Sequence, residues 1–102
     1  MATVLTKKDF KKAIAKGEWV VDFWAEWCGP CKIMAPQFDK AEKKLTKINF
    51  GKVDVDDQFE LASEYDVMSI PTTIFFKNGE QVDRYTGAMT LDMIERRVKD
   101  NF

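Results

Sequence analysis

The sequence predicts an α/β fold in which a central mixed β-sheet carries helices on both faces. The segment Trp19–Trp24 is apolar apart from one aspartate, as expected for a strand buried on both faces. Strand-like runs alternate with segments whose apolar residues recur at helical spacing. The dipeptide Asn78-Gly79 separates two strand-like runs, which indicates a β-hairpin. A mixed sheet covered on both faces is the arrangement that buries all of these segments.

Five strands and four helices are expected, in the order β-α-β-α-β-α-β-β-α. The expected strands are Thr3–Leu5, Trp19–Trp24, Ile48–Val55, Thr72–Lys77 and Gln81–Thr86. Capping residues mark where three of the helices begin. Thr6 is followed by Asp9 in the position of a capping box, and Asp57 is followed by Glu60 in the same relation. Thr90 is expected to cap the last helix.

Each helix carries one apolar stripe, which we expect to face the sheet. The stripes consist of Phe10, Ala13 and Ile14; of Met34, Phe38, Ala41 and Leu45; of Leu61, Ala62 and Tyr65; and of Leu91, Ile94, Val98 and Phe102. Pro36 lies inside the second helix and is expected to kink it, because proline lacks an amide donor and crowds the preceding turn.

Length and composition predict one domain over residues 1–102. The 102 residues are 45% hydrophobic, which is enough for one core. The formal net charge of −1 gives no electrostatic reason to bind nucleic acid or an anionic membrane. The sequence shows neither a secretory signal nor an apolar run of membrane-spanning length. We therefore expect a cytoplasmic protein.

The two cysteines are the first chemically informative residues. Cys28 falls where a strand ends and a helix begins, so its sulfur would face unpaired amides and the positive end of the helix dipole. No Ser, Thr, Asp or Asn directly precedes this helix, so sulfur itself is expected to occupy the capping position. These surroundings favour the thiolate, which is the nucleophilic form. Cys31, one turn further on, is expected to be less exposed and to react second.

The cysteine pair allows two other interpretations. A zinc site normally needs four ligands, and the chain has no histidine and no further cysteine. Two buried, unreactive cysteines remain an alternative, although their position at a helix start argues against it. The acidic group Asp54, Asp56 and Asp57 lacks the glycine and distal glutamate of a calcium loop. No metal is therefore expected.

Asp22 is the second informative residue, because a carboxylate in an apolar strand is costly unless it is paired or protonated. Burial would raise its pKa and suit it to general acid–base assistance when Cys31 reacts. Lys52, in the neighbouring strand, could pair with it. An edge position with access to solvent is the alternative. Pro71 stands at the start of a strand, and the sequence does not reveal whether its peptide bond is cis.

Several segments together resemble the thioredoxin family. They are Val21–Lys32, which contains Trp27-Cys28-Gly29-Pro30-Cys31, and Lys52–Asp56, Ile70–Thr72, Phe76–Gly79 and Thr86–Ala88. The resemblance covers essentially the whole chain and implies the thioredoxin fold. It also implies that Cys28 is the nucleophile, that Cys31 resolves the mixed disulfide and that Asp22 is the buried carboxylate, with Lys52 nearby.

The resemblance further implies a cis-proline at Pro71 and a flat surface that binds target proteins. The surface residues that it implies are Trp27, Gly29, Pro30, Ile70, Pro71, Gly87 and Ala88. The implied function is that of a protein-disulfide reductase and dithiol-disulfide electron carrier, monomeric and without a cofactor other than its redox-active disulfide. The implied partners are disulfide-containing target proteins and thioredoxin reductase, which draws its electrons from NADPH.

Two rival functions share this fold. An oxidase or isomerase would run the exchange in the opposite direction, and Gly29-Pro30 between the cysteines disfavours it. A non-catalytic binding subunit or chaperone is the other rival. The chain has no glycine-rich phosphate loop, so no bound nucleotide is expected.

Overall fold

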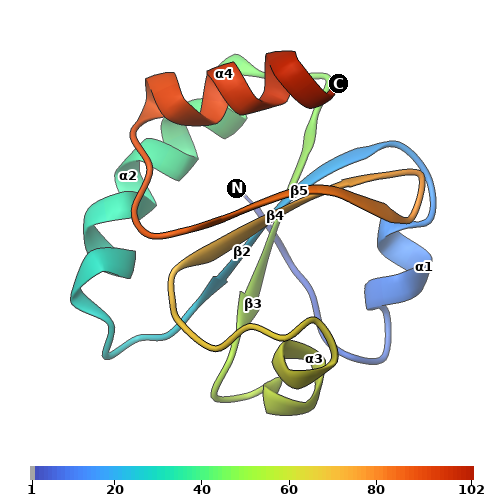
Figure 1. Cartoon of the computed structure of the whole chain (residues 1–102), viewed down its shortest axis with the longest axis vertical. Helices are drawn as coiled ribbons and strands as arrows, with labels where there is room; N and C mark the ends of the chain where they lie inside the picture. The colour runs from blue at the N-terminus through green and yellow to red at the C-terminus, as the bar shows by residue number, and fades with distance from the viewer. Residues whose placement is uncertain (1) are drawn as a thin grey trace.

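A five-stranded mixed sheet forms the centre of the protein in a computed structural model that describes residues 2–102 (Figure 1). The strands are β1 (Thr3–Val4), β2 (Glu18–Trp24), β3 (Asn49–Asp54), β4 (Thr72–Lys77) and β5 (Glu80–Thr86). Their order across the sheet is β1-β3-β2-β4-β5, with β2 parallel to β3 and antiparallel to β4. The predicted fold class is therefore confirmed, and β2 is the central strand.

Four helices cover the two faces of the sheet. They are α1 (Phe10–Ile14), α2 (Gly29–Lys44), α3 (Phe59–Glu64) and α4 (Leu91–Asn101). Helices α2 and α4 pack against each other on one face, whereas α1 and α3 lie on the other (Figure 1). α2 continues through Pro36; the kink expected there stays a prediction.

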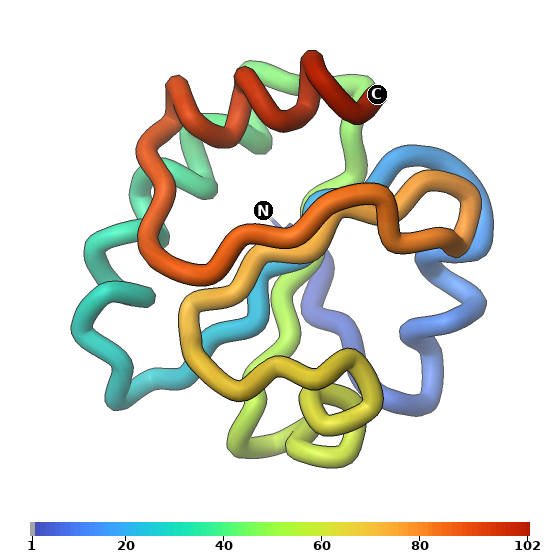
Figure 2. The backbone as a smooth tube through the Cα atoms, in the orientation of Figure 1, coloured from blue at the N-terminus to red at the C-terminus, as the bar shows by residue number. Residues whose placement is uncertain are grey.

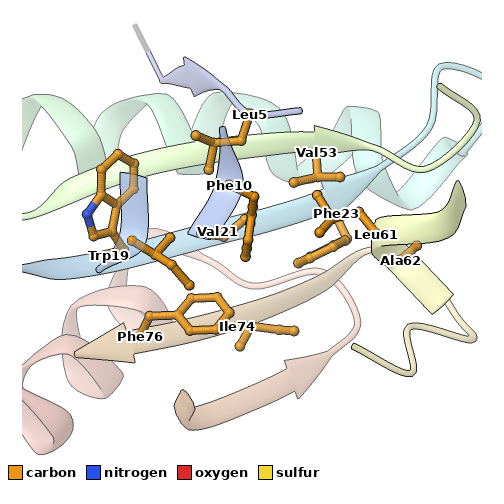
Figure 3. Packing of buried hydrophobic residues seen from close by; sticks show 11 residues of the cluster. Leu5, Phe10, Trp19, Val21, Phe23, Val53, Leu61, Ala62, Ile74 and Phe76 are labelled. Atoms are coloured by element: carbon orange, nitrogen blue, oxygen red, sulfur yellow. The ribbon is translucent and has the colours of Figure 1, made fainter. Parts of the chain in front are cut away.

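Alternation along β2 divides its side chains between two cores. Trp19, Val21 and Phe23 pack with α1 and α3 in an aromatic-rich cluster (Figure 3). Val20 faces the opposite way, into the cluster formed with α2 and α4. Asp22 shares the face of Val20, so the strand directs this carboxylate toward the layer that contains α2.

The hairpin between β4 and β5 turns at Asn78 and Gly79, as predicted. Both residues have positive φ, 49° and 87°, which is the backbone of a two-residue hairpin turn. The turn lies beside the loop between α1 and β2 (Figure 2), where the Asn78 amide donates to the Gly17 carbonyl at 2.9 Å. The Asn78 side chain accepts from the Gly17 amide at 2.9 Å. The turn is therefore anchored to the rest of the fold.

Two helix starts differ from the prediction. Asp57 does not cap α3, which begins at Phe59 after Gln58. The Asp54 carboxylate instead accepts from the Asp56 amide at 2.9 Å, forming a turn that delays the helix. α1 begins at Phe10 with Asp9 as its N-cap, so the predicted cap at Thr6 is also wrong, whereas the cap predicted at Thr90 is confirmed. Thr90 accepts from the Met93 amide, and the Asp9 carboxylate accepts from the Thr6 amide at 2.8 Å, which is the reciprocal half of a capping box.

A close approach of β1 to β3 requires a glycine at position 51. A Cβ atom there would lie 2.6 Å from Cδ1 of Leu5, which is itself buried. We expect Gly51→Ala to lower the free energy of unfolding by about 1–3 kcal/mol, because the buried leucine has little room to move. Urea unfolding measures this. Gly29→Ala, where a Cβ meets nothing within 4 Å, is the matched control. Equal unfolding midpoints for the two variants would contradict this packing.

Candidate active site

Cys28 and Cys31 lie at the start of α2 and are joined by a disulfide, with their Cα atoms 5.3 Å apart. A turn closed by the Cys28 amide and the Ala25 carbonyl leads from β2 to this position. Cys28 is the N-cap of α2, and its Sγ accepts a hydrogen bond from the Cys31 amide at 3.2 Å. The expectation that sulfur caps the helix is confirmed. The same amide is placed to stabilise negative charge on Cys28 after reduction.

Burial does not distinguish the two cysteines in this oxidised form. Each exposes only 4% of its surface, so the expectation that Cys28 is the more exposed is wrong here. The disulfide packs against Ala25 and half-buried apolar neighbours that include Ile70, whose carbonyl oxygen lies 3.8 Å from Cys28 Sγ. The two cysteines therefore differ in hydrogen bonding and not in exposure, because the sulfur of Cys28 accepts from a helix-start amide.

Asp22 is buried in the middle of the sheet, with 1% of its surface exposed. It lies opposite Lys52 of β3 on one side and Thr73 of β4 on the other, so the alternative of an edge position is excluded. Burial raises the pKa of Asp22 to about 7, and the positive charge of Lys52 opposes part of that rise. A carboxyl group with this pKa can gain or lose a proton near neutral pH.

The Lys52 ammonium is held by aromatic rings. Its Nζ lies 5.5 Å from the centroid of Trp24 and 5.7 Å from that of Phe38. Such cation–π contacts keep the charge near Asp22 while the lysine stem stays half-buried. The structure thus brings Lys52 into the neighbourhood predicted for it.

The Ile70-Pro71 peptide bond is cis, as the family resemblance implies. The Pro71 carbonyl accepts from the Gly87 amide at 2.8 Å, which joins the loops before β4 and after β5. Both loops thereby lie at the end of the sheet where β2 ends and the chain continues to Cys28. Of the surface residues expected from the sequence, Trp27, Gly29, Pro30 and Ala88 are exposed, Ile70 and Gly87 are half-buried, and Pro71 is buried.

Trp27 exposes 69% of its surface beside the cysteines. Its indole Nε1 donates to the Asp56 carboxylate at 2.8 Å, which fixes the ring although it is in solvent. Sequence reasoning treated Asp56 only as part of an acidic group and missed this role. An exposed tryptophan often has a partner for its N–H, but the sequence gives no indication of which residue supplies it.

Arg84 on β5 was also missed. Its guanidinium donates to the Tyr65 carbonyl and, at 3.2 Å, to the Asp66 carbonyl. Asp66 has a positive φ of 54° at the beginning of the segment that leads to Pro71. Arg84 therefore braces this segment from the neighbouring strand. The hydrogen bonds go to backbone oxygens, which have no sequence signature.

Nothing in the described part of the chain resembles a metal centre, since no three His, Cys, Asp or Glu residues gather there. None of the helices within residues 2–102 is both long and apolar enough to cross a membrane.

A cysteine pair that can close a disulfide at a helix start, on this fold, defines a thiol-disulfide oxidoreductase. The family model described as Thioredoxin matches residues 1–100. The chain belongs to the thioredoxin family. The thioredoxin of Chlamydia caviae is 40% identical over 101 residues, which cover 99% of each chain.

Solved structures agree with this assignment. The X-ray structure of Fasciola hepatica thioredoxin has a TM-score of 0.91 and 38% identity, and the match covers 100% of both chains. Another match comes from a study of thiol resolution in a yeast mitochondrial 1-Cys peroxiredoxin through the glutathione and thioredoxin systems. Its TM-score is 0.90 and its identity 34%, and it covers 97% of this chain and 94% of that one.

The raised pKa of Asp22 predicts a specific dependence of stability on pH. Between the ordinary pKa of 3.8 and the folded value of about 7, the folded protein holds a proton that the unfolded chain has released. The contribution of Asp22 to stability should therefore be greatest at low pH and fall as the pH rises through this range. The difference in free energy of unfolding between Asp22→Asn and the parent should change in favour of the variant by up to about 4 kcal/mol as the pH rises from about 4 to about 8.

Urea unfolding of the oxidised protein across this pH range measures the gain. Asp39→Asn, which alters an exposed carboxylate on α2, is the control and should run parallel to the parent. Parallel stability profiles for Asp22→Asn and the parent would rule out a protonation change at Asp22 on folding.

Proposed function

We propose that the chain is a protein-disulfide reductase that carries electrons, as a dithiol-disulfide pair, from a reductase to target proteins. The observation that supports this most strongly is the hydrogen bond from the Cys31 amide to Cys28 Sγ at the start of α2. The bond marks Cys28 as the sulfur whose negative charge the helix stabilises, so Cys28 is the attacking group.

In the first step the Cys28 thiolate attacks one sulfur of a target disulfide. A bond forms between that sulfur and Cys28 Sγ, and the target disulfide breaks. The second target sulfur leaves with the electron pair and takes up a proton. The product is a mixed disulfide between Cys28 and the target.

In the second step Cys31 attacks Cys28 Sγ and releases the target with both of its cysteines reduced. The Cys31 thiol must lose a proton, and the proposed acceptor is Asp22, on the face of β2 that α2 covers. Its pKa of about 7 suits this role at neutral pH. Two electrons pass to the target, and the Cys28-Cys31 disulfide is restored. The step is fast because the two residues are held with their Cα atoms 5.3 Å apart.

Target proteins would bind across the surface formed by Trp27, Gly29, Pro30, Ile70, Gly87 and Ala88. An extended target segment could pair with the backbone before Pro71, as in β-strand addition. Met68, two residues before Ile70 in the same loop, is a further apolar side chain and exposes 93% of its surface. A surface of this kind favours polypeptide targets over small disulfides.

A reductase must return two electrons to the disulfide after each cycle. We propose thioredoxin reductase, supplied by NADPH, as this partner, and a protein that acts as a monomer in the cytoplasm. A reducing compartment suits a site that must return to the dithiol. We propose no cofactor beyond the redox-active disulfide and no role in binding nucleic acid or membranes, in keeping with the net charge of −1.

Reduction of insulin by the chain, with NADPH and a thioredoxin reductase, tests this function. Turnover should be lost in Cys28→Ser, because no attacking sulfur remains. Cys31→Ser should instead accumulate a mixed disulfide with the target, which non-reducing electrophoresis detects. If the Cys28→Ser, Cys31→Ser double variant keeps its biological activity, the chain acts by holding partners and the proposal is wrong.

A further inference from the structure

Two side-chain oxygen atoms buried within residues 2–102 have no hydrogen-bond partner: Oδ1 of Asp22 and Oγ1 of Thr73. Asp22 exposes 1% of its surface and Thr73 exposes none. An unpaired polar atom at this depth is costly, so each such atom requires an explanation.

The register of the sheet places these two residues side by side. Asp22 of β2 and Thr73 of β4 are directly opposite each other in an antiparallel pair, so both side chains project from the same face. Opposite residues in such a pair have Cβ atoms about 4.5–5.5 Å apart. At that separation, rotation of the two side chains brings a hydroxyl within hydrogen-bonding distance of a carboxylate.

The other charged or titratable groups on this face are occupied or lie further along the sheet. Lys52, from β3, packs its ammonium over two aromatic rings. Tyr85 of β5 lies beyond Thr73 and is covered by the Arg97 guanidinium of α4, which also donates to Asp83. Among the buried residues of α2, Cys31 is held in the disulfide and does not titrate in this oxidised form. The Thr73 hydroxyl is therefore the uncharged donor that the sheet places directly opposite Asp22, on the side away from Lys52.

We propose that Thr73 is a positioning residue for the Asp22 carboxyl group, with its hydroxyl hydrogen-bonded to Asp22 in both protonation states. A hydroxyl donates to a carboxylate and accepts from a carboxylic acid, so one residue satisfies either form. This property suits a buried group that gains and loses a proton in every catalytic cycle. The role in turnover rests on the proposed function, whereas the hydrogen bond itself does not.

Titration of the Asp22 carboxyl carbon by NMR in the oxidised protein tests the hydrogen bond without any activity. Thr73→Val keeps the shape and removes the hydroxyl. The Asp22 midpoint should then rise by about 0.5–1 pH unit, because the ionised form loses a donor. Thr73→Ser should restore the parent midpoint, and Thr73→Ala replaces the valine variant if that variant fails to fold. An unchanged midpoint in Thr73→Val or Thr73→Ala would overturn the proposal.

The pH profile of the resolving step tests the role in turnover. At pH 7, Thr73→Val should slow resolution by about threefold, since a smaller fraction of Asp22 is ionised, and the profile should shift to higher pH. In an Asp22→Asn background the same substitution should have no further effect. Equal slowing in both backgrounds would show a structural role only and overturn the proposal. A parent protein that reduces no disulfide, with the NMR shift present, would reject the proposed function alone.

Discussion

The active site depends on one hydrogen bond, donated by the Cys31 amide to Cys28 Sγ. It exists because the chain changes from strand to helix within a few residues after β2, and because sulfur takes the place of the usual capping oxygen. A helix start has several amides without a partner inside the helix, and here the Cys31 amide donates to the sulfur of Cys28. The unpaired amides that every helix start has thereby stabilise negative charge on a reactive sulfur.

The central strand β2 leads to Cys28 and also carries Asp22, the group proposed to exchange a proton with Cys31. β2 is paired on both sides, so a side chain in its middle is buried whatever its polarity. Asp22 occupies that position, and burial favours its neutral form. Ionisation of Asp22 near neutral pH therefore lowers the stability of the folded state. Such a cost is consistent with a group retained for its chemistry.

Much of this organisation could be predicted from the sequence, because its causes are local. The apolar run of β2, the turn at Asn78 and Gly79 and the missing oxygen cap before α2 each follow from a few neighbouring residues. The ordered set of matching segments, rather than the cysteine spacing alone, made the family resemblance specific. What could not be predicted depends on contacts between segments far apart in the chain. The hydrogen bond from Trp27 to Asp56 joins two loops, and the equal burial of the cysteines depends on packing around Ile70.

Two further features could not be predicted, the first because of a local turn and the second because of the pairing between distant strands. Asp57 has the spacing of a capping residue, but a turn formed by Asp54 moves the helix start to Phe59. The position of Thr73 opposite Asp22 depends on the register between β2 and β4, and the sequences of the two strands do not specify that register. Long-range pairing is thus the main information that the structure adds to the sequence.

The rate at which the reduced protein is alkylated by iodoacetamide, followed against pH with mass-spectrometric assignment to Cys28, tests the central claim most directly. If the helix start stabilises the thiolate, the rate should reach half its maximum clearly below pH ~8.5, the value typical of a free thiol. A rate that is still negligible at pH 7 and reaches its midpoint at or above ~8.5 would contradict it.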